Sequence, residues 1–181
     1  PRRGREPRMR SPALALWARF AAFTLAAWST VVFVHPLRPG AVLSPEVALS
    51  AGALAGVVLF VVLTRTPPAR PSLAGASVGV ALGKLAFLAL AATNEELVWR
   101  RLVLGEALRA GPIAAIVVST VAFAGAHRTR QVAHLATGAT FGAAYVATGS
   151  LAASLAAHWT YNALFAGAVD RARRPAVAEG G

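Results

Sequence analysis

The sequence predicts an all-α fold, a polytopic transmembrane bundle of about six membrane-spanning helices. Of its 181 residues, 56% are hydrophobic and 14% are charged, whereas roughly 25% are charged in an average soluble domain. The apolar residues come in blocks of about 17–22, and a helix needs about 20 such residues to cross a hydrocarbon core of about 30 Å. Composition and block length together exclude an ordinary soluble domain.

Six apolar blocks follow one another along the chain. The first is too long for the apolar part of a signal peptide, so we interpret it as an uncleaved span. His-Pro-Leu-Arg-Pro-Gly ends this block, and a loop rich in Arg and Pro separates the second block from the third. Ala-Gly-Pro, Arg-Thr-Arg and Thr-Gly-Ser mark the later breaks. The predicted spans are 13–34, 45–63, 73–109, 113–127, 132–148 and 151–169.

These spans define a transmembrane domain at 13–170, between a basic tail at 1–12 and a short tail at 171–181. Within the domain, the polar motifs concentrate in a core at 74–169. Small residues spaced four apart allow helices to approach closely in lipid, where packing replaces the hydrophobic drive. Such spacings link Gly52 with Gly56, Gly75 with Gly79 and Gly83, and Gly138 with Gly142.

Membrane topology explains the net charge of +11. Most arginines lie in the two tails and in the loops after the second and fourth spans, which share one side if six spans are right. The positive-inside rule makes that side cytoplasmic. We therefore expect a multi-pass protein of the cell inner membrane with both termini cytoplasmic, the lipid bilayer as partner and no nucleic acid. The opposite side holds Arg38 and, at the end of the third span, the segment with Arg100, Arg101 and Arg109, which is the exception to the rule.

Spacing brings several polar residues to one depth of the membrane. Glu95 and His127 lie about equally far from the Ala-Gly-Pro turn, roughly 21–23 Å at a rise of 1.5 Å per residue. In the second hairpin, His158 and Asn162 lie roughly 13 and 19 Å from the Thr-Gly-Ser turn. Straight antiparallel helices would therefore gather these residues and Glu96 in one slab. His134, at the start of the fifth span, is expected at the interface.

Three pairs in this slab have the i,i+4 spacing that places side chains on one helix face. Ionisable groups inside spans are costly and are usually functional or paired. Three structural interpretations stay open beside the functional one. The glutamates could be the solvated end of a span, and His127 could mark an interface. His158 and Asn162 could simply form hydrogen bonds between helices. The three pairs are Glu96 with Arg100, Phe123 with His127, and His158 with Asn162.

In order, the motifs read Glu-Glu-x-x-x-Arg at 95–100, Phe-x-x-x-His at 123–127 and His-x-x-x-Asn at 158–162. This set resembles the CPBP family of intramembrane proteases. That family includes the type II CAAX prenyl endopeptidases and bacterial bacteriocin-processing or immunity relatives. The resemblance covers about 74–169. It implies hydrolysis of a membrane-associated peptide or protein without a cofactor.

The resemblance also implies roles for the six motif residues. Glu95 and His127 would activate a water, and Glu96 and Arg100 would hold the geometry. His158 and Asn162 would then donate hydrogen bonds to the oxyanion of the tetrahedral intermediate.

Two other functions remain open. In a zinc-dependent version of the same protease, Glu95, His127 and His158 would be the ligands, although the chain has no His-Glu-x-x-His motif. A non-catalytic, immunity-type protein could bind a peptide or lipid in the same place. The chain has no cysteine, which excludes a disulfide framework, a thiolate metal site and a cysteine protease. A prenylated tail, a leader peptide and a C-terminal sorting signal are all compatible substrates, and a composition typical of GC-rich bacteria disfavours the first.

Overall fold

The computed structural model describes residues 12–40, 43–68 and 78–172, and within these ranges every regular element is a helix. The predicted all-α class is therefore confirmed. The helices are α1 (Pro12–Val34), α2 (Pro45–Thr64), α3 (Val78–Glu96), η1 (Leu97–Leu104), α4 (Gly105–Ala107), η2 (Leu108–Ala110), α5 (Pro112–Gly125), α6 (Gln131–Thr148) and α7 (Leu151–Ala172).

The described helices agree with a membrane-spanning bundle. Three helical stretches are long and apolar enough to cross a membrane, Leu14–Val34, Pro45–Thr64 and Val78–Ala110. The last is one continuous run of 33 residues, as the predicted third span requires, and the predicted start of that span at 73–77 lies outside the described residues. α5 is a shorter apolar helix.

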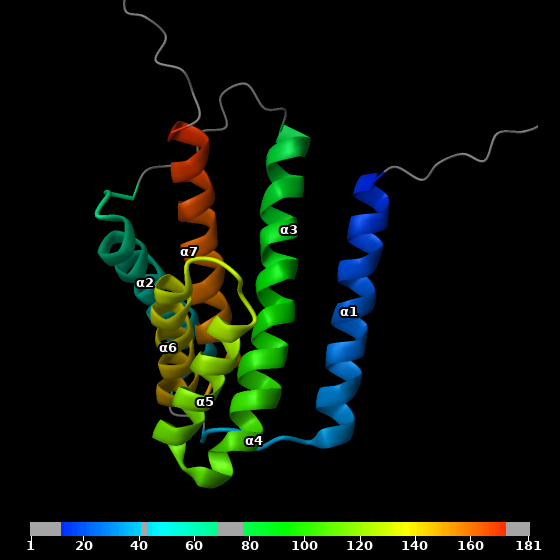
Figure 1. The fold of residues 1–181 in the computed structure, drawn as a ribbon, viewed down its shortest axis with the longest axis vertical. Helices are drawn as coiled ribbons and strands as arrows, with labels where there is room; N and C mark the ends of the chain where they lie inside the picture. Colours follow the sequence, from blue (N-terminus) through cyan, green and yellow to red (C-terminus); the bar gives the residue numbers. More distant parts are fainter. Residues whose placement is uncertain (1–11, 41–42, 69–77, 173–181) are drawn as a thin grey trace, which may run out of the picture.

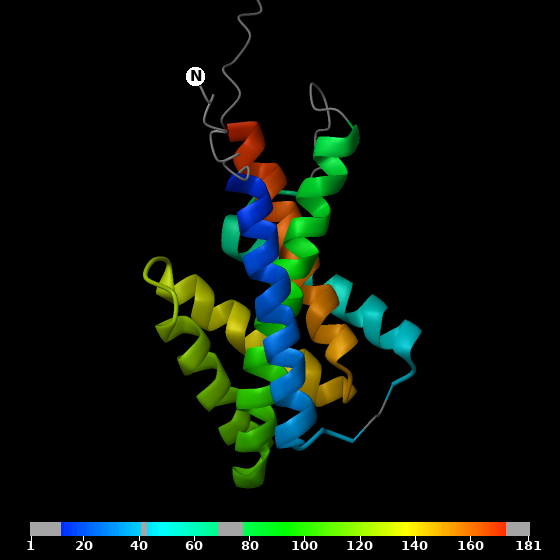
Figure 2. The ribbon, with the colours of Figure 1, turned by 90° about the vertical axis from the view of Figure 1, so that its right-hand side faces the viewer.

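The helices form an up-and-down bundle (Figures 1 and 2). α2 packs along α7, α5 packs along α6, and α1 lies at the edge of the bundle against α3 and η1. The starts of α1 and α3 and the end of α7 lie at one end of the bundle (Figure 1). The α5–α6 hairpin rises from the other end, and its loop lies partway along α3 in both views (Figures 1 and 2).

Helix lengths explain why that loop is recessed. α5 has 14 residues and the run from Val78 to Ala110 has 33, which correspond to about 21 Å and about 50 Å. The α5–α6 loop therefore lies level with the middle of the long helix, where Glu95 and Glu96 lie. This is the depth that the sequence predicts for the polar slab.

Helix ends follow the residue types at the turns. Ser44 caps α2 by accepting a hydrogen bond from the Val47 amide at 3.5 Å, and Pro45 begins the helix. Gly111, with φ of 97°, and Gly149, with φ of 67°, adopt a backbone conformation that favours glycine. The predicted Ala-Gly-Pro and Thr-Gly-Ser turns are confirmed.

Two local features differ from the expected straight helices. η1 is a π-helix, a rare form that is frequent at functional sites. The predicted end of the fourth span at 127 is wrong, because α5 ends at Gly125 and His127 lies in the following loop. There the His127 amide bonds to the Ala124 carbonyl at 3.1 Å, a tighter turn that ends the α-helix.

Glycines spaced four apart lie at close helix contacts in α2 and α6 but not in α3. Added Cβ atoms at Gly52 and Gly56 would meet the α7 backbone at the carbonyls of Ala153 and Ala157. Gly138 is tight as well, with Phe123 and Thr120 at 3.2 Å from an added Cβ. Around Gly79 and Gly83, nothing lies within 4 Å of such an atom, and Gly75 lies outside the described residues.

We expect Gly52→Ala to destabilise the fold by about 1–3 kcal/mol, because the methyl group would press on the α7 backbone. Unfolding of the purified protein in mild detergent, followed by circular dichroism, measures the change. Gly83→Ala is the matched control and should be neutral or slightly stabilising, since alanine favours helix by about 1 kcal/mol. Equal midpoints for the two variants would contradict close packing of α2 on α7.

Candidate active site

The site is centred on Glu96, the last residue of α3, whose exposed fraction is 0%. Its Oε1 lies 2.8 Å from Nδ1 of His158, and its Oε2 lies 3.2 Å from Nε of Arg100. The hydroxyl of Ser154 donates a hydrogen bond to the same Oε2. A buried carboxylate requires such partners, because an isolated charge away from water is very costly.

Arg100 is equally buried and neutralises Glu96 from η1. Its guanidinium lies 5.0 Å from the ring centre of Phe123 and 5.5 Å from that of Phe141. Nη2 also lies 3.5 Å from the Gly138 carbonyl. Both rings present negative faces to the cation, which is a favourable arrangement in a desolvated site. The predicted ion pair between Glu96 and Arg100 is therefore present.

Glu95 has a different environment from its neighbour. Its side chain is 35% exposed, and Oε2 lies 3.7 Å from Nε2 of His158. It also lines a cavity of about 330 Å³ between α1 and α3, with Arg19, Phe20, Phe23, Ala91 and Asn94. His158 thus lies between a buried and an accessible carboxylate, and its ring stacks on Phe141 with centres 4.7 Å apart.

His127 lies in the loop after α5, and its Nδ1 is 2.7 Å from the Phe123 carbonyl. A carbonyl only accepts, so Nδ1 carries the proton and Nε2 is left as an acceptor when the ring is neutral. The ring lies 4.6 Å from that of Phe123 and stacks on His134 at 3.9 Å. The predicted i,i+4 contact with Phe123 is present, although it bridges a helix end.

Phe123 holds the predicted residues together. Besides His127 and Arg100, its ring contacts His158 with centres 6.4 Å apart. Among the described residues, His127 makes no hydrogen bond or ion pair with either glutamate. Asn162 lies one turn beyond His158 on α7 and is half-buried, and no described residue hydrogen bonds to its side chain.

The structure adds two polar residues to the site. Ser154 lies one turn before His158 on α7, so the same i,i+4 spacing could have indicated it. The ring of His134, which was expected at the interface, stacks on that of His127. Nothing in the sequence distinguishes the stacked arrangement from two separate histidines.

Polar contacts also fix the surrounding helices. Arg101 is buried, and its Nη1 donates to the carbonyls of Pro36 and Leu37 at 2.8 and 2.9 Å. The Asn94 amide donates to the Phe20 carbonyl at 3.2 Å and joins α1 to α3. Arg100 and Arg101 depart from the positive-inside pattern because both are buried inside the bundle, whereas Arg109 is exposed near the turn. In the outer part of the bundle, Lys84 pairs with Asp170.

The arrangement of donor groups bears on zinc binding. Within the described ranges, no group of three or more His, Cys, Asp or Glu side chains is arranged to hold a metal ion. Glu95 and His158 are adjacent, whereas His127 stacks on His134 and makes no described hydrogen bond or ion pair with Glu95 or Glu96. As arranged in the described part of the chain, Glu95, His127 and His158 do not meet as a zinc site.

Fold and site together define a class, a polytopic helical membrane protein with a buried Glu-Arg-His site. The model of one family matches residues 77–164, and its description is type II CAAX prenyl endopeptidase Rce1-like. This match over 77–164 supports the resemblance to the CPBP family, of which the Rce1-like CAAX-type proteases are members. Comparisons with curated proteins and with solved structures give no match. The matched segment contains every motif residue, whereas α1 and α2 lie outside it.

Removing the charge of Glu96 should destabilise the fold. We expect Glu96→Gln to lower the free energy of unfolding by roughly 3–5 kcal/mol, because Arg100 would keep a buried charge without its partner. Glu106→Gln is the matched control, since Glu106 forms an i,i+3 pair with Arg109 at the surface. Detergent-solubilised variants can be compared by thermal unfolding, and equal stability of the two would show that the buried pair is dispensable.

Proposed function

We propose that the chain is an intramembrane endopeptidase that hydrolyses a peptide bond close to a terminus of a membrane-anchored substrate. The observation that carries the proposal is the unequal environment of two adjacent carboxylates. Glu96 is enclosed by Arg100 and His158, whereas Glu95 is partly exposed and lines a cavity. A buried carboxylate can hold the geometry, and an accessible one can take a proton.

In the proposed reaction, Glu95 accepts a proton from a water whose oxygen attacks the scissile carbonyl carbon. Nε2 of His127 is the second acceptor that can orient this water. The proton held by Glu95 then passes to the leaving amine nitrogen as the C–N bond breaks. One water is consumed, and the products are a carboxylic acid, which keeps the second proton of the water, and an amine.

The oxyanion needs donors at the opposite side of the carbonyl. Because Nδ1 of His158 is committed to Glu96, Nε2 can donate only when the ring carries both protons. Asn162, one turn further along α7, would supply the second donor.

The activity test replaces the proposed base without changing its shape. We expect Glu95→Gln to reduce cleavage by at least about a hundredfold, since positioned acid–base groups contribute about 10²–10⁴ in rate. Mass spectrometry of the termini of membrane proteins compares cells that have the chain, the variant or neither. His127→Ala should also be impaired.

Two control arms accompany this assay. Glu106→Gln removes a surface carboxylate and should cleave like the wild type. A chelator should leave cleavage unchanged, whereas inhibition reversed by zinc would favour the zinc-dependent version. Full activity of Glu95→Gln would disprove the assignment of the base. If the wild-type chain alters no termini, a peptide- or lipid-binding protein becomes the better description.

We further propose that the protein is a multi-pass protein of the inner membrane with both termini in the cytoplasm. The starts of α1 and α3 and the end of α7 share one end of the bundle (Figure 1), in support of this topology. The natural chain has no cysteine, so single introduced thiols report sidedness. We expect an impermeant reagent to label Gly40→Cys in intact cells and Thr66→Cys only after permeabilisation. The reverse pattern would invert the topology.

A further inference from the structure

A cavity of about 260 Å³ lies near the end of the bundle where α1 ends and α6 turns into α7 (Figures 1 and 2). Four polar residues from separate segments line it: Arg38 from the α1–α2 connection, Arg101 from η1, Tyr145 from α6 and Ser150 from the α6–α7 turn. The proposed chemistry uses none of them. Among the described residues, no acidic side chain lines this cavity, so its formal charge is positive.

Arg101 is the buried charge of this cavity. Its exposed fraction is only 7%, and Nη1 donates to the carbonyls of Pro36 and Leu37. These carbonyls are neutral, and in the described part of the chain no carboxylate forms an ion pair with Arg101. Its neighbour Arg100, by contrast, has Glu96 as its counter-charge. A cation taken out of water without an opposing charge is costly, so the surroundings of Arg101 favour an added anion.

Arg38 adds a second positive charge to the same cavity. It is exposed, and it makes no hydrogen bond or ion pair with another described residue. Two like charges that line one cavity repel each other, and an anion between them turns this repulsion into attraction. Both arginines therefore favour the same kind of ligand.

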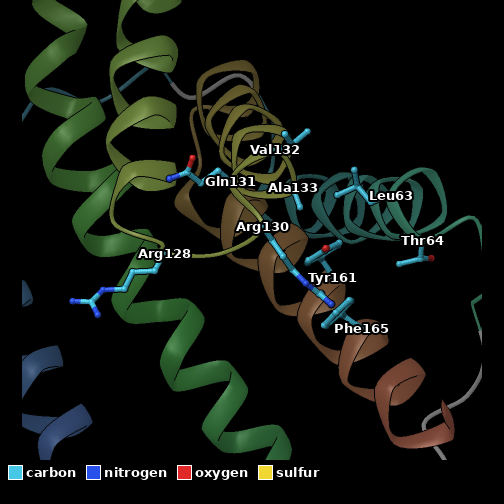
Figure 3. A pocket seen from close by; sticks show the side chains of 9 residues that line it. All are labelled: Leu63, Thr64, Arg128, Arg130, Gln131, Val132, Ala133, Tyr161 and Phe165. Atoms are coloured by element: carbon cyan, nitrogen blue, oxygen red, sulfur yellow. The ribbon is translucent and has the colours of Figure 1, made fainter. Parts of the chain in front are cut away.

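The larger basic cavity of the chain lacks such a buried charge. It holds about 850 Å³ between the end of α2, the α5–α6 loop and α7 (Figure 3). There the guanidinium of Arg130 lies 4.8 Å from the ring centre of Phe165, and Arg128 points away from the cavity (Figure 3). Both of these arginines are exposed, whereas Arg101 is enclosed by the protein. Burial without a counter-charge therefore distinguishes the smaller cavity from the larger one.

The donors that remain in the smaller cavity suit a phosphate group. Nη1 alone makes both carbonyl contacts of Arg101, so the fork of donors on its other nitrogens can serve a ligand. A guanidinium binds two oxygens of a phosphate side by side, which a single carbonyl does not allow. The Ser150 hydroxyl accepts a hydrogen bond from the Ala152 amide at 3.3 Å, and its own proton can still be donated.

An apolar wall on the same cavity indicates that the ligand is amphiphilic. Trp28, Leu97 and Leu151 form this wall. Trp28 is 50% exposed, and Leu25 and Val32 lie on the same face of α1, with exposed fractions of 69% and 55%. The cavity is smaller than the roughly 300–1,000 Å³ of a site for a drug-sized molecule. It can therefore hold a headgroup, with the acyl chains outside along this face of α1.

The position of the cavity agrees with the level of lipid headgroups. Arg38 lies four residues beyond Val34, the end of α1, and Ser150 lies in the turn between two helices. The ends of membrane-spanning helices lie at the boundary between hydrocarbon and headgroups, where tryptophan is enriched. A phosphate at this level can reach both arginines without leaving the bilayer.

From these observations we infer that the cavity binds the phosphate group of an anionic phospholipid, with Arg101 and Arg38 as its ligands. Phosphatidylglycerol fits better than phosphatidylcholine, because the choline ammonium would bring another positive charge into the cavity. The bound lipid ties α1 and the α6–α7 turn to η1, which also carries Arg100. None of the lipid ligands takes part in the proposed peptide hydrolysis, so this inference does not rest on the proposed function.

Fluorescence quenching of Trp28 measures the binding. The purified full chain in a neutral detergent is titrated with phosphatidylglycerol that carries bromine on its acyl chains, and separately with phosphatidylcholine brominated in the same way. We expect half-maximal quenching at about a tenfold lower mole fraction of phosphatidylglycerol, because its phosphate gains charge-assisted bonds. The chain has four tryptophans, so Trp28→Phe identifies the part of the quenching that belongs to Trp28.

Further variants assign this preference to the two arginines. Arg38→Gln should lower the preference to about threefold or less, and Arg101→Gln should abolish it. Arg38→Gln removes no described hydrogen bond, so it tests the inference even where Arg101→Gln fails to fold. Arg109→Gln is the matched control, because Arg109 is exposed at the same end of the bundle but does not line the cavity. It should keep the full preference.

Equal quenching of Trp28 by the two brominated lipids would overturn the inference, and so would a preference that Arg38→Gln leaves unchanged. Competition separates a lipid phosphate from a soluble one. Unbrominated phosphatidylglycerol should displace the brominated lipid, whereas soluble glycerol phosphate should not, because it has no contact with the apolar wall. Equal displacement by both competitors would make the cavity a site for soluble anions and disprove the lipid assignment.

Discussion

The neutralisation of Glu96 is the constraint on which the rest of the structure depends. A carboxylate with no exposed surface must find its counter-charge and donors inside the protein, because the surrounding lipid offers none. Those partners come from two places in the chain, Arg100 on η1 and the Ser154 and His158 pair on α7. Satisfying one charge therefore fixes the long helix against the last one.

The π-helix places two consecutive arginines so that each side chain finds partners inside the protein. Arg100 reaches Glu96 and the carbonyl of Gly138, whereas Arg101 reaches the α1–α2 connection. Ser119 on α5 donates to the Trp99 carbonyl at 2.7 Å, so α5 is also tied to this irregular segment. A π-helix is a rare form, and here it is supported by contacts with α1, α5 and α6.

Much of this could be predicted from the sequence, because its signals are local. Block length predicts the helical segments, Pro and Gly predict the turns, and the i,i+4 rule predicts the pairing of Glu96 with Arg100. Counting residues from each turn predicts the depth of the polar slab without tertiary information. The glycine pattern predicts close packing in α2 but not its absence in α3, since spacing does not say which face meets a neighbour.

What could not be predicted depends on contacts between distant segments. The π-helical turn has no signature in a single sequence, and the displacement of His127 from α5 follows from a tight turn. The stacking of His134 on His127 and of Phe141 on His158 depends on how α5, α6 and α7 meet. Side-chain periodicity describes one helix at a time, so it carries no information on these ring contacts.

Phe141 joins the candidate active site to the aromatic rings further along α7. Its ring contacts the Arg100 guanidinium and the His158 ring on one side and Tyr161 on the other. Interiors are close-packed, so a ligand that shifts Tyr161 must shift Phe141 or be accommodated by it. Because Phe141 also borders the cation that neutralises Glu96, a shift of its ring would bear on the pair that Glu96 forms with Arg100.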